Sequence, residues 1–135
     1  MSFKVGDELW VERHLGPFKY HHAGIYVGND EVVHVFETPL SAISNLIHDH
    51  EIVKIHKTSL EDFTKGDVFH KGPTVPLRSS GTIKEFTMST VGQDFKYHPI
   101  NSNCQHFTCY MVSGRWFSME ADLIRQRLRT SEESE

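Results

Sequence analysis

The sequence predicts a single domain of the α+β class. Its 135 residues suffice for one hydrophobic core, and 38% hydrophobic with 24% charged residues is usual for a globular chain. The first half contains short alternating or β-branched runs separated by turn residues, which is typical of strands. The second half changes to the 3.6-residue period of amphipathic helices. Because the chain shows no repeats and no linker, we expect one sheet and its helices to share one core.

The first half holds five predicted strands: residues 7–13, 21–28, 31–36, 51–57 and 67–72. The second and third runs flank Gly28-Asn29-Asp30, a turn signal, so they should form a tight hairpin. The stretch SLEDFTKG between the last two strands is polar and is broken by Gly66. Residues 41–49 are assigned a short helical turn.

The second half holds three predicted helices: residues 81–91, 104–113 and 119–128. Ser79 or Ser80 is the expected N-cap of the first helix, and Gly92 ends it. Residues 1–129 should therefore form one domain. Residues 130–135, TSEESE, are expected to be a disordered acidic tail.

Bulk composition disfavours several classes of protein. A formal net charge of −4 argues against a general nucleic-acid binder, which needs clustered Lys and Arg. No apolar run approaches the roughly 18 residues that cross a bilayer, and the start MSFKVGDELW has no secretory pattern. Two cysteines cannot make a disulfide framework. We therefore expect a cytoplasmic, reducing setting.

Ten histidines are the compositional oddity and raise the question of a metal site. His48-Asp49-His50 and His56 could be drawn as ligands, but they lack a cysteine at zinc-site spacing. The sequence therefore predicts no metal and no cofactor. Most of the histidines should be solvated or structural.

Cys104 has two interpretations. With Phe107, Met111 and Val112 it forms an apolar stripe at i, i+3, i+7 and i+8, which suits a small buried hydrophobic residue. It also follows the good N-cap Asn103 in the first turn of a helix, where N–H groups and the helix dipole stabilise a thiolate and an oxyanion. The second interpretation requires a base.

The predicted hairpin offers candidates for that base. His22 and His34 should lie across from one another at the same end of the ribbon. Two such histidines could bind a metal, stack in a core or serve a nucleophile. A cysteine, a base and a polar group that orients the base make the papain-type arrangement in any chain order. Tyr97, seven residues before Cys104, could add a hydroxyl.

Two segments resemble the boxes of a known family. HAGIYVGNDEVVH is similar to the H-box of the lecithin retinol acyltransferase-like, or H-box/NC, proteins, and NSNCQHFTCYMVSG resembles their Asn-Cys-Glu-His-Phe box. KGDVFHKG and GTIKEFTMSTVGQDFKY match the family's central strand and the helix before the cysteine, so the resemblance covers roughly residues 5 to 115. It implies a permuted papain-like α+β fold, an antiparallel sheet with the nucleophile at a helix N-terminus.

The resemblance also implies roles for single residues. Cys104 would be the nucleophile, His22 the general base and His34 the third, polar member that orients the base. His21 competes with His22, but only His22 stands two residues before the small residue and four before the tyrosine of GIY. Tyr97 would stabilise the oxyanion or shape the pocket.

The chain departs from the family pattern at three places. Ala23 replaces the usual aromatic residue after the base, which should widen the pocket or change the accepted lipid. Gln105, a further candidate for the oxyanion site or the pocket, replaces a glutamate and keeps its hydrogen-bonding capacity. His106 matches the box, but a structural place at the helix start suits it better. The chain ends without the apolar anchor of many animal members, so any membrane contact is expected to be transient.

The function that this resemblance implies is a thiol-dependent phospholipase A and acyltransferase. The acyl group of a glycerophospholipid would pass to Cys104 as a thioester and then to water, an amine or another lipid. Two other classes stay open: a cysteine amidase or peptidase of the same fold, and a non-catalytic H-box/NC interaction module. The implied partner is a phospholipid or another acyl donor, with no nucleic acid, and the sequence does not indicate an oligomeric state.

Overall fold

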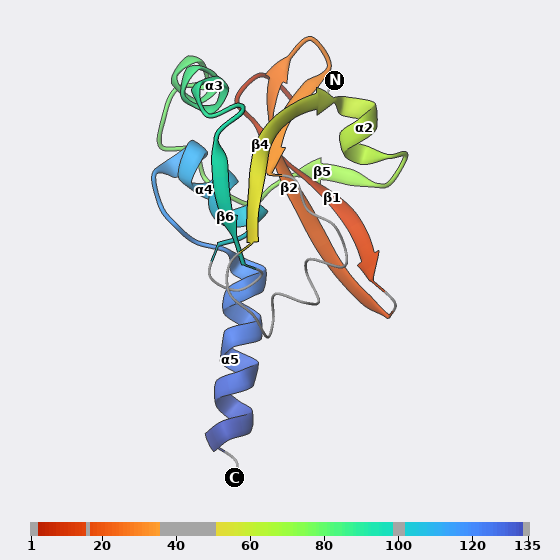
Figure 1. The fold of residues 1–135 in the computed structure, drawn as a ribbon, viewed down its shortest axis with the longest axis vertical. Coiled ribbons are helices and arrows are strands. Elements are labelled where there is room, and N and C mark those ends of the chain that lie inside the picture. Colours follow the sequence, from red (N-terminus) through yellow and green to blue (C-terminus); the bar gives the residue numbers. More distant parts are fainter. Residues whose placement is uncertain (1–2, 16, 36–50, 99–101, 134–135) are drawn as a thin grey trace.

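The computed structural model describes residues 3–15, 17–35, 51–98 and 102–133. Within them, one antiparallel sheet has the strand order β5-β1-β2-β3-β4-β6 (Figure 1). The strands are β1 (Glu8–Leu15), β2 (Phe18–Gly28), β3 (Glu31–Val35), β4 (Glu51–Ser59), β5 (Phe69–Lys71) and β6 (Asp94–Tyr97). Together with the helices described below, this sheet confirms the α+β class.

The edge strand β6 is the strand that the sequence did not predict. The family resemblance placed its residues, DFKY, with the helix before the cysteine. Gly92 adopts a φ of 88°, which turns the chain back after that helix, and β6 then pairs with the first residues of β4. Pairing with a distant strand, rather than local pattern, makes this segment a strand.

The β2–β3 hairpin has the predicted tight turn but a different register. Asn29 and Asp30 both have positive φ, 52° and 56°, as a type I′ turn requires. A register shift between Tyr26 and Gly28 brings Gly24, not His22, opposite His34. The expectation that the two histidines face one another directly was therefore wrong: a regular two-residue turn already pairs His34 with Ile25, and the irregularity moves its partner by only one residue, to Gly24.

The described residues form four helices: α2 (Leu60–Thr64), α3 (Ser80–Ser89), α4 (Cys104–Ser113) and α5 (Met119–Glu133). Ser79 caps α3, as predicted, by accepting from the Thr82 N–H at 3.2 Å. The short α2 was not predicted. The predicted turn at 41–49 and the His48-Asp49-His50 run lie outside the described residues.

Helix α5 is longer than predicted. It continues through Glu133, so residues 130–133, expected in a disordered tail, are helical. Figure 1 shows α5 pointing away from the rest of the molecule. None of the helices in the described ranges has the length and apolar content to cross a bilayer.

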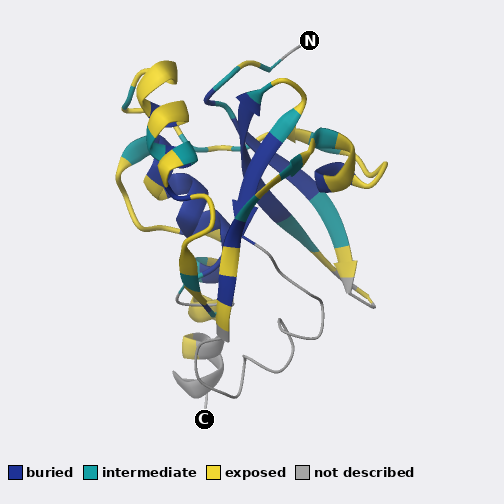
Figure 2. Cartoon of the chain, turned by 45° about the horizontal axis from the view of Figure 1, so that its top comes forward, coloured by how far each residue is buried: buried dark blue, intermediate teal, exposed yellow. Residues whose placement is uncertain are grey.

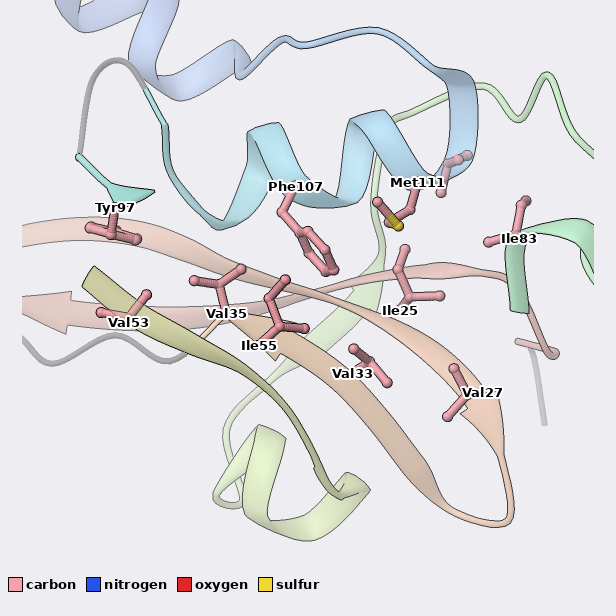
Figure 3. Packing of buried hydrophobic residues seen from close by; sticks show 11 residues of the cluster. Ile25, Val27, Val33, Val35, Val53, Ile55, Ile83, Tyr97, Phe107 and Met111 are labelled. Atoms are coloured by element: carbon pink, nitrogen blue, oxygen red, sulfur yellow. The ribbon is translucent and has the colours of Figure 1, made fainter. Parts of the chain in front are cut away.

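Helices cover both faces of the sheet. Helices α3 and α4 pack on one face over the main core, which Figure 3 shows with α2 on the far side of the strands. The predicted stripe of α4 is confirmed, since Cys104, Phe107, Met111 and Val112 are all buried. On the other face, Phe63 of α2 packs against Leu9, Val11, Tyr26 and Val32. Buried residues therefore gather in the middle of the sheet and along α4 (Figure 2).

Candidate functional site

Local sequence fixes the position of Cys104 as the first residue of α4. The Asn103 side chain accepts from the N–H groups of Gln105 and His106 at 2.9 and 3.2 Å. His106 completes the capping box, because its Nδ1 accepts from the Asn103 N–H at 3.0 Å. Gly114 ends the helix with a φ of 78°. His106 therefore has the structural role expected for it.

Burial keeps that capping histidine neutral. The pKa of His106 is lowered to about 4 by burial, with a smaller effect of the Arg125 charge. A neutral ring can accept the Asn103 N–H through Nδ1 at physiological pH. The start of α4 is thus held by hydrogen bonds that do not depend on a charge.

Helix α4 begins against the edge of β2. The Cys104 Sγ lies 3.9 Å from the carbonyl oxygen of His21, and the Gln105 Nε2 donates to the same oxygen at 3.1 Å. Tyr26 bonds to residues 6 and 7 on the β1 side, so by alternation the His21 carbonyl points to the β3 side. In the described residues, β2–β3 pairing reaches only to Gly24 and His34. Among the described residues, the thiol therefore lies beyond the last pair that β2 and β3 form.

The two hairpin histidines are in direct contact. His22 Nε2 lies 2.9 Å from His34 Nδ1, and both rings pack on Phe63 with centroid separations of 5.4 and 5.1 Å. The other nitrogen of His34, Nε2, lies 2.9 Å from the Thr58 hydroxyl. His22, His34 and Thr58 thus form one hydrogen-bonded chain across β2, β3 and β4.

The direction of this chain follows from its far end. The Thr58 hydroxyl donates to the Ser59 carbonyl at 3.2 Å, so it accepts the proton of His34 Nε2. The Nδ1 of His34 then accepts from His22 Nε2, provided that His34 is neutral. Its pKa is in fact lowered to about 2, first by burial and then by the charge of His22. In this arrangement the proton of His22 is on Nε2 and the lone pair is on Nδ1.

A third histidine, His56, packs against the pair. The rings of His34 and His56 have centroids 4.3 Å apart. The pKa of His56 is also lowered, by burial first and by the charge of His22 second. Because the surroundings of His34 oppose its protonation, it suits an orienting role better than that of a base.

Gly24 makes room for the histidine pair. A Cβ at this position would lie 2.5 Å from Val32 Cγ1 and 2.8 Å from Phe63 Cε1. The absent side chain lets Phe63 lie directly on the strand, under both imidazole rings. Arg13 holds α2 in this position by donating to the carbonyl oxygens of Phe63 and Thr64.

Cys104 packs beside Ala23, the neighbour of His22 on β2. Side chains alternate along a strand, so His22 leaves β2 on the α2 face, whereas His21 and Ala23 point to the α4 face. Cys104 packs with Ala23 and Trp10 on that second face. The structure thus brings His22 and His34 together and puts the thiol at the neighbouring strand edge.

His21, the competing histidine, has a different set of partners. Its Nδ1 lies 2.9 Å from Glu120 Oε2, and its ring lies 5.0 Å from that of Trp10. Gln105 joins this group, since its Nε2 donates to Glu120 Oε1 as well as to the His21 carbonyl. Both amide protons of Gln105 are therefore engaged, and the residue anchors the start of α4 to β2 and α5.

Tyr97 lies in the main core. It is 2% exposed and belongs to the cluster that contains Phe107, one helical turn beyond Cys104 (Figure 3).

The hydrogen bonds of the N-cap limit which N–H groups at the start of α4 could bind an oxyanion. Asn103 already accepts from the N–H groups of Gln105 and His106, so these two backbone donors are engaged and are not open to an oxyanion.

Sequence reasoning missed three residues of this region. Thr58 is separated from His34 by 24 positions, and Glu120 from His21 by 99. Phe63 lies in the stretch that was interpreted only as polar. The single available signal was the Ser59 cap before Leu60, which predicts a helix start. Within the described ranges, no three His, Cys, Asp or Glu side chains are arranged to hold a metal ion.

Comparison with known proteins relates the chain to one family. The family model described as lecithin retinol acyltransferase matches residues 1–117. A human protein, phospholipase A and acyltransferase 2, is 30% identical over 124 residues, covering 82% of this chain and 71% of the human protein. Cys104, His22 and His34 all lie inside the matched range.

Proposed function

Because the chain belongs to the lecithin retinol acyltransferase family, we propose that it is a thiol-dependent phospholipase A and acyltransferase. Family membership and the human relative support an activity of the phospholipase or acyltransferase type in general. The observation that supports the finer proposal is the 2.9 Å contact between His22 of β2 and His34 of β3, together with the contact of Cys104 with the His21 carbonyl of β2.

The first half-reaction acylates the thiol. His22 Nδ1 takes the Cys104 proton, and Sγ attacks the ester carbonyl carbon of a glycerophospholipid. The carbonyl oxygen becomes an oxyanion, which the positive end of α4 stabilises. When the C–O bond breaks, the departing alkoxide takes the proton from His22. The products are a lysophospholipid and an acyl thioester.

The second half-reaction restores the thiol. Water, an amine or another lipid gives a proton to His22 as its oxygen or nitrogen attacks the thioester carbonyl. The C–S bond then breaks, and the thiolate recovers the proton from His22. His34 keeps the ring of His22 oriented in both halves and stabilises the charged imidazolium that forms between them.

The thiol lies beside β2 next to His22. The Sγ contacts the carbonyl oxygen of His21, the residue that precedes His22, and this position supports a proton transfer between Cys104 and His22. The competing base, His21, is on the thiol's own face and has a carboxylate partner in Glu120. The family motif favours His22 as the base. Replacing each histidine in turn tests which of the two is the base.

Lipid turnover with matched cysteine variants tests the proposed activity. Wild-type protein should release fatty acid and lysophospholipid from detergent-dispersed phosphatidylcholine. Cys104→Ser should abolish the release, and Cys109→Ser should retain it. Membrane contact is proposed to be transient, so dispersed or short-chain lipid should react faster than sealed vesicles. Release that survives in Cys104→Ser would contradict the proposal, and turnover of an amide donor alone would reassign the chain to an amidase.

A further inference from the structure

A cavity of about 330 Å³ lies on the α4 face of the sheet. Trp10 and Gln105 form part of its wall. Trp10 also packs against Cys104, and Gln105 follows Cys104 in the helix. The cavity therefore starts one side chain away from the sulfur, and its size is at the low end of small-molecule sites.

The outer part of the cavity is built from exposed apolar side chains. Val75 and Leu77, after β5, are 72% and 68% exposed, and Phe117 and Met119, at the start of α5, are 42% exposed. Large apolar side chains left in water at the mouth of a cavity indicate a partner that is itself apolar.

Arg115 also lines the cavity, and most of the other polar groups in the wall are engaged within the protein. The Glu8 carboxylate accepts from the Thr108 hydroxyl and from the Thr74 N–H. Ser118 donates to Gln105 Oε1 at 2.8 Å, and Ser113 donates to the Cys109 carbonyl at 2.7 Å. A ligand in this space finds these partners taken, so hydrocarbon is the chemistry that the cavity favours.

The hollow on the opposite face has a different character. It measures about 230 Å³ and is lined by His22 and His34 together with Arg13, Asp62, Lys65 and Asp67. The four charged residues make this hollow unsuited to an alkyl chain. An alkyl chain would displace water from the charged groups and would offer them no hydrogen bond in return. The sheet thus separates a charged hollow beside the histidines from an apolar cavity beside Trp10.

We propose that the apolar cavity binds the fatty acyl chain of the donor lipid. This inference rests on the proposed function, since it assigns the hydrocarbon part of that substrate. The acyl chain enters between Leu77 and Met119 and passes Trp10. This path directs the carbonyl end of the acyl group toward Cys104. The polar part of the lipid stays outside the cavity.

The direct test uses Trp10 as the reporter. The chain has two tryptophans, and the exposed Trp116 is removed as Trp116→Phe. Brominated decanoic acid should then quench Trp10 fluorescence saturably, and unbrominated decanoic acid should not. Leu77→Asn should weaken the apparent Kd by about tenfold, which corresponds to roughly 1.4 kcal/mol of lost apolar contact. The matched control is Ile52→Asn on β4, which is also exposed but does not line the cavity.

Chain-length dependence provides a second readout. The kcat/KM for soluble p-nitrophenyl esters should rise with acyl length, by up to about fourfold for each methylene that enters the cavity, or about 0.8 kcal/mol. Leu77→Asn should lower the decanoyl-to-acetyl ratio, whereas Ile52→Asn should leave it unchanged. Circular dichroism verifies that both variants are folded.

Two results distinguish this inference from the proposed function. Ester turnover that needs Cys104, with no quenching of Trp10 and no length dependence, would overturn the acyl-chain site and leave the activity standing. Saturable quenching that Leu77→Asn weakens, without any acylation of Cys104, would support the cavity and overturn the activity. Equal effects of Leu77→Asn and Ile52→Asn would also overturn the site.

Discussion

Replacement of Thr58 by valine tests the direction of the hydrogen-bonded chain. Valine keeps the shape of threonine but lacks the hydroxyl that accepts from His34 Nε2 at 2.9 Å. A net hydrogen bond between neutral groups is worth about 0.5–1.5 kcal/mol, and a buried donor left without a partner costs about 1–3 kcal/mol. His34 can avoid this cost by moving its proton to Nδ1. His22 then accepts through Nε2 and carries its own proton on Nδ1, the nitrogen that should receive the thiol proton.

The loss should therefore appear in catalysis rather than in substrate binding. We expect Thr58→Val to lower kcat about 5- to 30-fold, which corresponds to about 1–2 kcal/mol, with KM little changed. Thr58→Ser restores the hydroxyl and should recover most of the rate. Both variants are assayed with a soluble short-chain ester, and urea unfolding verifies that the fold is retained.

The pH dependence separates a positioning role from a structural one. If Thr58 sets the tautomer of His22, Thr58→Val should shift the pH midpoint at which iodoacetamide alkylates Cys104, and Thr58→Ser should not. A valine variant with wild-type kcat and an unchanged midpoint would refute the proposed chain. Equal impairment of the serine and valine variants would show that the methyl group, not the hydroxyl, matters.

Three further predictions concern the histidines and their support. Gly24→Ala should destabilise the fold by about 1–3 kcal/mol, because its Cβ would overlap Phe63; an unchanged urea midpoint would contradict the packing. The free energy of unfolding should fall on acidification, because the pKa of His34 is lowered to about 2 in the folded protein, whereas the unfolded chain takes up this proton below about pH 6.5. The loss approaches about 2.7 kcal/mol between pH 6.5 and 4.5. If His34→Gln lost stability with pH as steeply as the wild type, His34 would not be the cause. His22→Ala should remove nearly all esterase activity and His21→Ala little of it; the reverse would assign the base to the histidine that Glu120 contacts.

Features encoded by neighbouring residues could be predicted from the sequence. Asn103 and Gly114 mark the two ends of α4, and the apolar spacing that follows Cys104 identifies its buried stripe. Capping and helical periodicity act within a few residues, so a single sequence carries enough information to predict them. The turn at Asn29-Asp30 was predictable for the same reason.

Contacts between distant segments could not be predicted in this way. The sequence predicted that His22 and His34 lie near each other, but the shift near Gly28 changes which residues pair. Thr58 became a partner of His34 only because β4 pairs with β3, and no local pattern identifies its hydroxyl. His22 and Ala23 point to opposite faces of β2. Which of these faces α4 covers is likewise decided only when the complete sheet has formed.

The covalent intermediate tests the central claim most directly. After brief incubation with phosphatidylcholine that carries one kind of fatty acid, intact-mass spectrometry should detect one added acyl group on Cys104. Hydroxylamine, which cleaves thioesters and spares amides, should remove it. The adduct should be absent in Cys104→Ser and present in Cys109→Ser. An adduct on Cys109, or none with any ester or amide donor while the protein is folded, would contradict the account and favour a non-catalytic binding module.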